Sequence, residues 1–172
     1  MVEMKNLVLI GMPGSGKSTV GVILAKAMTR PYLDSDILIQ LSENRSLQDI
    51  VDADGYMVLR RIEEQILLGI RCENHVIATG GSAAYSEKAM HHLKKNGIII
   101  FLDASLDTLR ARIHNYETRG LAKRPEQSFD DLFQERFELY TRYADIIIDS
   151  NDRTQDQVCD DIYLKLQPLL VS

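Results

Sequence analysis

The segment that most constrains the fold lies near the start of the chain. Residues 6–10, NLVLI, form a short apolar run, and residues 11–18, GMPGSGKS, follow at once with the spacing GxxxxGK[ST]. Residues 17–28 then place apolar side chains at helical intervals: Val20, Ile23, Leu24 and Ala27. An apolar strand that ends in a glycine-rich turn and leads into a helix is a unit of parallel α/β sheets.

The rest of the chain continues this alternation of strand-like and helix-like segments. The expected strands are short and apolar: 6–10, 31–33, 75–78, 98–102 and 146–148. The expected helices have amphipathic spacing or a capping residue: 17–28, one opened by Ser46, 55–71, 86–95, two opened by Ser105 and Ser128, and 154–166. The pattern predicts an α/β fold of one domain, with three α/β/α layers around a five-stranded parallel sheet. Ligands of such sheets lie beyond the carboxyl ends of the strands.

Charge and composition exclude several classes of partner. The chain has 172 residues, a formal net charge of −5 and no block of Lys or Arg, so nucleic acid and anionic membranes are not expected partners. The apolar run at 6–10 is too short for a signal peptide or a membrane span. Cys72 and Cys159 lack CxxC spacing and are expected to be buried thiols of a cytoplasmic monomer. The histidines form no HxxxH or HExxH motif, so a zinc site is not expected.

The motif at 11–18 has the chemistry of a phosphate-binding loop. Its glycines allow backbone angles at which successive N–H groups point toward phosphate oxygens. Lys17 can reach the terminal phosphates and the Ser18 hydroxyl can ligate Mg²⁺. A plain glycine turn is the alternative, but here the motif follows a strand and opens a helix, as phosphate binding requires. The predicted nucleotide-binding residues of this loop are Gly11, Gly14, Ser15, Gly16, Lys17, Ser18 and Thr19.

A pair of carboxylates follows the second expected strand. Asp34 and Asp36 stand two residues apart at the carboxyl edge of the sheet, so they lean the same way and can take separate tasks. One can hold the magnesium water shell while the other faces an acceptor hydroxyl. The alternative is that one of them is the N-cap of a helix at 37–42. The pair favours a reaction in which a phosphoryl group passes from a nucleotide to a second substrate.

These motifs resemble the shikimate kinases, small P-loop kinases of the nucleoside-monophosphate-kinase fold. The resemblance covers nearly the whole chain. Besides the phosphate loop it rests on Asp34-Ser-Asp36, on 55–64 with its Arg60-x-x-Glu63, on Thr79-Gly80-Gly81, and on Glu135-Arg136-x-x-Leu-Tyr140. Each match is short, but their order and spacing together are specific. The resemblance implies an ATP-dependent phosphotransferase that acts on the 3-hydroxyl of shikimate in aromatic amino-acid biosynthesis.

The resemblance also assigns roles to single residues. Lys17, Asp36 and Arg119 are the expected catalytic residues; Asp36 would take the hydroxyl proton, and a mobile lid would supply Arg119. Arg112 falls where the family stacks an arginine on adenine. The expected acceptor-binding residues are Asp36, Arg60, Gly80, Gly81 and Arg136. The acceptor helices would lie within 35–72 and the lid within 113–128.

Elementary chemistry agrees with several of these roles. Ser18 and Asp34 offer the oxygen ligands that Mg²⁺ prefers. Arginine guanidinium groups can grip a carboxylate at two points, although most arginines are ordinary surface residues. Glu63 stands three residues after Arg60 on one helix and is expected to orient it.

The chain departs from the family pattern around the acceptor. Ser82 replaces a third glycine, Gly120 replaces a lid proline, and Glu138 replaces a proline after Arg136. Val51 and Leu59 stand where the family places two phenylalanines against the ring of its substrate. Since glycine adds freedom to an open loop, lid closure should cost more and shikimate should bind more weakly than is usual for the family. An enzyme for another small hydroxy acid is the competing hypothesis.

Two other classes of function remain as alternatives. A regulatory NTPase would need a guanine-reading NKxD motif, which the sequence lacks. A non-catalytic nucleotide-binding module is disfavoured because Lys17, Ser18 and Asp34 are all present.

Overall fold

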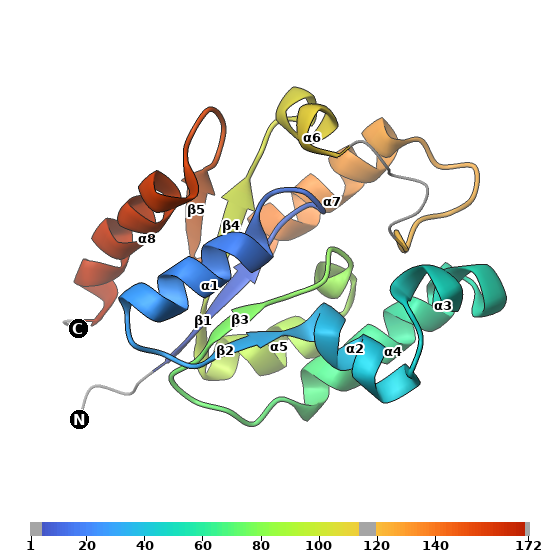
Figure 1. The fold of residues 1–172 in the computed structure, drawn as a ribbon, viewed down its shortest axis with the longest axis horizontal. Coiled ribbons are helices and arrows are strands. Elements are labelled where there is room, and N and C mark those ends of the chain that lie inside the picture. The colour runs from blue at the N-terminus through green and yellow to red at the C-terminus, as the bar shows by residue number, and fades with distance from the viewer. Residues whose placement is uncertain (1–4, 114–119, 171–172) are drawn as a thin grey trace.

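The computed structural model describes residues 5–113 and 120–170 (Figure 1). Five parallel strands form one sheet in the order β2-β3-β1-β4-β5. Their bounds are β1 (Asn6–Ile10), β2 (Tyr32–Asp34), β3 (Val76–Ala78), β4 (Gly97–Asp103) and β5 (Ile146–Asp149). The helices are α1 (Lys17–Ala27), α2 (Ser35–Glu43), α3 (Leu47–Asp54), α4 (Tyr56–Gly69), the short η1 (Ala83–Tyr85), α5 (Glu87–Lys95), α6 (Leu106–Arg112), α7 (Phe129–Tyr143) and α8 (Gln155–Leu170).

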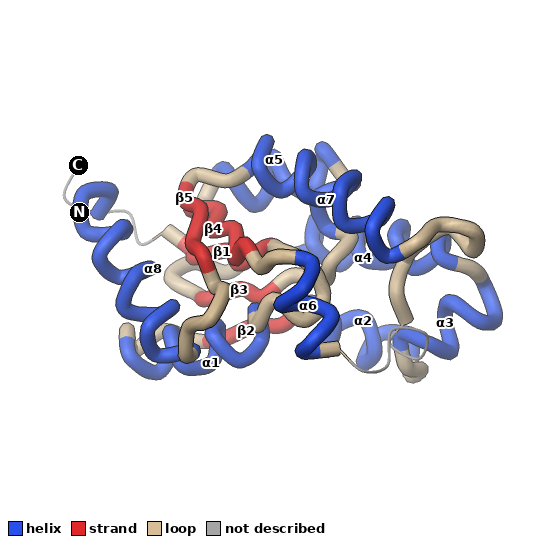
Figure 2. Tube along the Cα trace, turned by 90° about the horizontal axis from the view of Figure 1, so that it is seen from above, coloured by secondary structure: helices blue, strands red, loops and turns tan. Residues whose placement is uncertain are grey.

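Helices cover both faces of the sheet, which confirms the predicted three-layer α/β/α fold (Figure 2). Alternate residues of β1 enter the two halves of the core. Val8 and Ile10 pack on the side of α4, α5 and α7, whereas Leu7 and Leu9 pack on the side of α1 and α8. All five β1 residues are buried, which explains why this strand reads as a continuous apolar run.

Serine side chains begin most of the helices that follow loops, as the sequence predicts. Ser86 and Ser105 cap α5 and α6 through their side-chain oxygens. Ser46 and Ser128 form complete capping boxes with Asp49 and Asp131 at the starts of α3 and α7. These reciprocal bonds satisfy backbone donors that the first turn of a helix leaves free.

A smaller apolar cluster lies beside the main core. It joins α2, α3 and α4 through Ile39, Ile50 and Leu59, and it includes Ala122 from the segment before α7. This cluster fixes the helices of residues 35–72 around the carboxyl end of β2 and brings residues 120–122 against them. Figure 1 shows α2, α3 and α4 on one side of the sheet's carboxyl edge, with α6 on the other.

Element bounds differ from the sequence-based expectation by small amounts. Strand β2 begins and ends one residue later than expected, so Asp34 is its last residue. Helix α8 extends four residues beyond the expected end at Leu166 and includes Pro168. The 3-10 turn η1 was not expected, since three residues carry no periodic signal.

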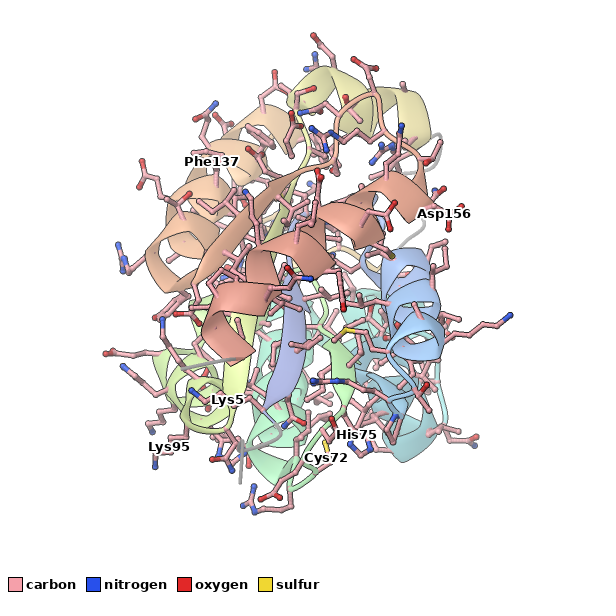
Figure 3. All side chains as sticks on the ribbon, turned by 90° about the vertical axis from the view of Figure 1, so that its left-hand side faces the viewer. Lys5, Cys72, His75, Lys95, Phe137 and Asp156 are labelled. Carbon is pink, nitrogen blue, oxygen red and sulfur yellow. The ribbon has the colours of Figure 1, made fainter. Side chains whose placement is uncertain are left out.

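The opposite end of the molecule holds features unrelated to the motifs. Figure 3 shows Lys5, Cys72, His75 and Lys95 gathered at the end where the strands begin. Both cysteines are free; Cys159 is buried as expected, but Cys72 is only half-buried. No described helix is long and apolar enough to cross a membrane.

Candidate active site

A cleft of about 510 Å³ opens at the carboxyl ends of the strands. The phosphate loop lines one part of it, the segments after β2 and β3 line another, and residues 120–122 form part of its cover. The predicted residues that line it are Gly14, Ser15, Gly16, Lys17, Ser18, Thr19, Asp36, Gly80, Gly81, Arg112 and Arg136. Gly11, Asp34 and Arg60 lie outside the lining, and Arg119 lies outside the described residues. The topology thus brings most of the predicted site together.

The glycines of the phosphate loop are required by its shape. Gly14 and Gly16 have φ values of +83° and +98°, which side chains rarely tolerate. At Gly11 (φ +147°) an added Cβ would lie 2.7 Å from the Leu102 carbonyl oxygen. The Ser15 hydroxyl is buried without a hydrogen-bond partner among the described residues. A buried hydroxyl donor in a loop with glycines at positive φ is a fitting environment for phosphate oxygens.

Lys17 lies at the centre of the loop, almost fully buried. Its Nζ donates to the carbonyl oxygens of Gly11 at 2.8 Å and Met12 at 2.9 Å. An ammonium has three donors, so one remains for a ligand. Burial lowers the pKa of Lys17 to about 8, although the charge of Asp36 opposes the shift. A bound phosphate would restore the charged form, because a nearby anion favours it.

Asp34 takes the helix N-cap role that the sequence offered as the alternative, and it also contacts the phosphate loop. Its carboxylate accepts from the backbone N–H of Asp36 at 2.9 Å and so caps α2. The same carboxylate accepts from the Ser18 hydroxyl at 2.7 Å and from the Tyr32 hydroxyl at 3.0 Å. Asp34 therefore faces the start of α1 directly, although the strand end keeps it out of the cleft lining. The described residues contain no cluster of three or more His, Cys, Asp or Glu that would form an all-protein metal site.

Asp36 faces the cleft from the first turn of α2. Burial and the charge of Asp34 raise its pKa, while Lys17 and Arg136 oppose that change. Gly80 brings the strand-β3 turn against Asp36 and Glu63: a Cβ on Gly80 would overlap oxygens of both carboxylates. A raised pKa makes Asp36 a stronger proton acceptor than an exposed aspartate.

Among the described residues Glu63 forms no ion pair or hydrogen bond with Arg60, so the expectation that it orients this arginine is wrong. Its side chain is buried and accepts a short hydrogen bond from the Ser82 hydroxyl through Oε2. Glu63 lines the cleft, and its Oε1 is buried without a hydrogen-bond partner in the described part of the chain. Burial and the neighbouring charge of Asp36 raise the pKa of Glu63 to about 7. The i,i+3 spacing suggested the wrong partner because the Ser82 hydroxyl approaches from another element.

Arg60 and Arg136 come together at one point on the cover of the cleft. The Nη2 atoms of both donate to the carbonyl oxygen of Ala122, each at 3.0 Å. Arg136 is almost fully buried and its Nη1 lies so near Gly81 that a Cβ there would be 2.6 Å away. The Nε atoms of both arginines have no hydrogen-bond partner among the described residues. The two fork-shaped groups retain the unused donors that a carboxylate ligand needs.

The positions that depart from the family pattern have distinct surroundings. Leu59 lines the cleft, but Val51 does not; Leu47 and Ile39 lie there instead. Gly120 has φ +64°, and a Cβ would lie 2.5 Å from the Leu47 carbonyl carbon. Its N–H donates to Gln48 Oε1 at 2.7 Å. A proline could make neither this backbone conformation nor this hydrogen bond, so Gly120 serves a specific contact between its segment and α3.

The remaining part of the cleft is formed by the β5–α8 connection. Arg112 Nη2 donates to the Ser150 carbonyl at 2.8 Å and lines this part together with Arg153 and Gln155. Figure 3 shows Asp156 at the neighbouring start of α8. Arg153 and Gln155 were not among the predicted site residues, although their position soon after the carboxyl end of the last strand was an available signal.

Comparisons with known proteins agree with this arrangement. The family model described as shikimate kinase matches residues 13–167. A shikimate kinase of Sulfurihydrogenibium is 38% identical over 165 residues, covering 95% of this chain and 99% of the relative. The chain belongs to the shikimate kinase family. The resemblance drawn from the motifs is thereby confirmed.

Solved structures of the shikimate kinase family share the fold. The enzyme of Acinetobacter baumannii in complex with shikimate superimposes with a TM-score of 0.85 at 28% identity, covering 95% of this chain and 93% of that one. The enzyme of Aquifex aeolicus gives a TM-score of 0.81 at 31% identity, covering 94% and 96%. The five-stranded parallel sheet and its helices therefore follow the shikimate kinase arrangement.

Proposed function

We propose that this protein transfers the γ-phosphoryl group of ATP to the 3-hydroxyl of shikimate, as a cytoplasmic step of aromatic amino-acid biosynthesis. The observation that carries the proposal is the shared cleft: Lys17 of the phosphate loop, Asp36 and Arg136 all line it. One side suits a triphosphate and the other suits an acid that carries a hydroxyl. We take the family's acceptor as this protein's own because these groups are present together.

The geometry supports direct transfer. The acceptor carboxylate would replace or join the Ala122 carbonyl at Arg60 and Arg136, which orients the ring with a hydroxyl toward Asp36. The hydroxyl oxygen forms a bond to the γ-phosphorus, the bond from that phosphorus to the β-phosphate oxygen breaks, and ADP leaves. Asp36 takes the hydroxyl proton. Lys17 stabilises the charge on the group in flight, and Arg119 is proposed to assist it from the lid at 113–128.

The residues around Ser18 fit a magnesium ion shared with the nucleotide. Mg²⁺ prefers oxygen ligands and keeps several waters, so one hydroxyl and one nearby carboxylate suffice beside phosphates. Ser18 would ligate the ion and Asp34 would hold its water shell, since the two side chains already contact each other. When bound, the ion would neutralise phosphate charge.

A screen of acceptors tests the proposal. ADP release from ATP would be followed with shikimate, quinate, homoserine and no acceptor. We expect ADP release that depends on shikimate and is weak with the others. Release without any acceptor would indicate an NTPase, and nucleotide binding without turnover would indicate a binding module. Turnover with another hydroxy acid alone would support the alternative acceptor. The observations that favour this alternative are Leu59 in the cleft and the hydrogen bond from Ser82 to Glu63.

Alanine at Arg60 or Arg136 should weaken acceptor binding. Each variant is expected to raise the KM for the acceptor roughly tenfold or more, since a charge-assisted hydrogen bond contributes about 1.5–3 kcal/mol. The KM for ATP should change much less. Arg61, exposed on α4 beside Arg60, provides the matched control as Arg61→Ala. An unchanged acceptor KM in both variants would mean that the carboxylate is held elsewhere.

A further inference from the structure

Arg60 and Arg136, the arginines proposed to bind the acceptor carboxylate, form a pair of close cations. Arg136 lowers the pKa of Arg60, after the larger effect of burial, which reflects like charges near each other. Among the described residues no carboxylate forms an ion pair with either guanidinium. Arg60 is half-buried, and its charge gains from a further favourable contact besides the bond to the Ala122 carbonyl, because removing charge from water is costly.

The ring of Tyr85 lies against the Arg60 guanidinium. The Arg60 guanidinium carbon lies 3.5 Å from the centroid of this ring, much closer than the 5.1 Å to Tyr56. Arg136 lies 5.5 Å from the same centroid. The face of an aromatic ring carries negative charge density and attracts a cation placed over it. Tyr85 thus stabilises Arg60 directly and is near enough to favour Arg136 as well.

The ring itself is fixed at its far end. The Tyr85 hydroxyl donates a short hydrogen bond to Glu135, which also accepts from Arg124 at 3.1 Å and from Gln127 at 3.0 Å. Tyr85 is the last residue of η1, three residues after Ser82 in the turn that follows β3. A ring anchored at both its backbone and its hydroxyl has little freedom to turn away from Arg60.

We propose that Tyr85 is a positioning residue for acceptor binding, which acts by holding the Arg60 guanidinium against its ring. Tyr85 contacts the face of the Arg60 guanidinium, so it would act on the acceptor through Arg60. Stacking on the ring fixes the plane of the guanidinium and does not use its N–H groups, which can then bind the acceptor. A carboxylate partner would occupy those N–H groups. The inference rests on the proposed function only in that the acceptor carries a carboxylate.

Steady-state kinetics of three variants test this role, with the acceptor that the wild-type enzyme phosphorylates best. Tyr85→Leu removes the ring and is expected to raise the acceptor KM roughly fivefold or more, within the strength of a partly desolvated cation–π contact. The KM for ATP should stay within about twofold of wild type, because Arg60 is proposed to bind the acceptor and not the nucleotide. Tyr85→Phe keeps the ring and should recover most of the lost affinity. Tyr163→Leu, on the exposed side of α8, is the control for the same substitution.

A double variant decides whether Tyr85 acts through Arg60. In Arg60→Ala the added Tyr85→Leu change should raise the acceptor KM little further, because two residues that act as one unit are not additive. Additive effects, an unchanged KM in Tyr85→Leu, or no recovery in Tyr85→Phe would each overturn the proposal. If the wild type prefers a hydroxy acid other than shikimate, the proposed function fails, yet these comparisons still test Tyr85 with that acceptor.

Discussion

Replacing Lys17 with alanine is expected to lower kcat at least about a hundredfold, as removal of an electrostatic stabiliser typically does. The change removes the buried ammonium that lies among the loop carbonyls and has a donor left for the phosphoryl group. The folded protein should be recovered, which circular dichroism and thermal melting would check. The measurement is acceptor-dependent ADP release at saturating ATP.

Lys26 provides the control for this prediction. It lies exposed in the last turn of the same helix α1, so Lys26→Ala makes the same change in charge away from the cleft. Its kcat should match that of the wild type. Near-normal turnover in a folded Lys17→Ala protein would remove the phosphate loop from the catalytic account.

Asparagine at Asp36 is expected to lower kcat by roughly a hundredfold or more, the usual contribution of a positioned proton acceptor. The amide keeps the size of the side chain but cannot take the hydroxyl proton. Because burial and Asp34 raise the pKa of Asp36, the acid limb of the wild-type rate profile should lie above the usual range for an aspartate. Below its pKa Asp36 is protonated, so activity is lost as pH falls.

The exposed Asp160 on α8 is a matched control, as Asp160→Asn. This variant should keep both the wild-type rate and its pH profile. A folded Asp36→Asn enzyme with more than a tenth of the wild-type kcat would show that the proton leaves by another route.

The sequence predicted those parts of the molecule that depend on local patterns. The strand, phosphate loop and helix at 6–28 follow from residues that are neighbours in the chain, and the position of Asp34 and Asp36 follows from the end of one strand. Serine caps were likewise readable, since a cap bonds within its own first turn. The order of the strands places these pieces at one edge without further information.

The contacts between distant segments could not be read in this way. The partner of Glu63 is Ser82 from the turn after β3, and the surface that Gly120 touches is α3. The ring against Arg60 comes from Tyr85, which lies twenty-five residues further along the chain. Such contacts depend on how helices pack, which residue spacing within one element does not encode.

Gly120 shows how this affects an inference about function. From sequence, glycine in place of the family's proline suggested a looser lid and a weaker grip on shikimate. The structure gives this residue a left-handed backbone in close contact with Leu47 and Gln48, where proline does not fit. The weaker affinity remains a prediction, but it now rests on Leu59 in the cleft rather than on a loose Gly120.

The position of the transferred phosphate tests the central claim most directly. The wild-type protein would be incubated with ATP, Mg²⁺ and shikimate, and the product examined by ³¹P–¹H correlated NMR. We predict one new phosphate monoester whose phosphorus couples to the proton on C3 of shikimate, formed in proportion to ADP. ADP accompanied only by inorganic phosphate, or a phosphate on another hydroxyl, would contradict the assignment.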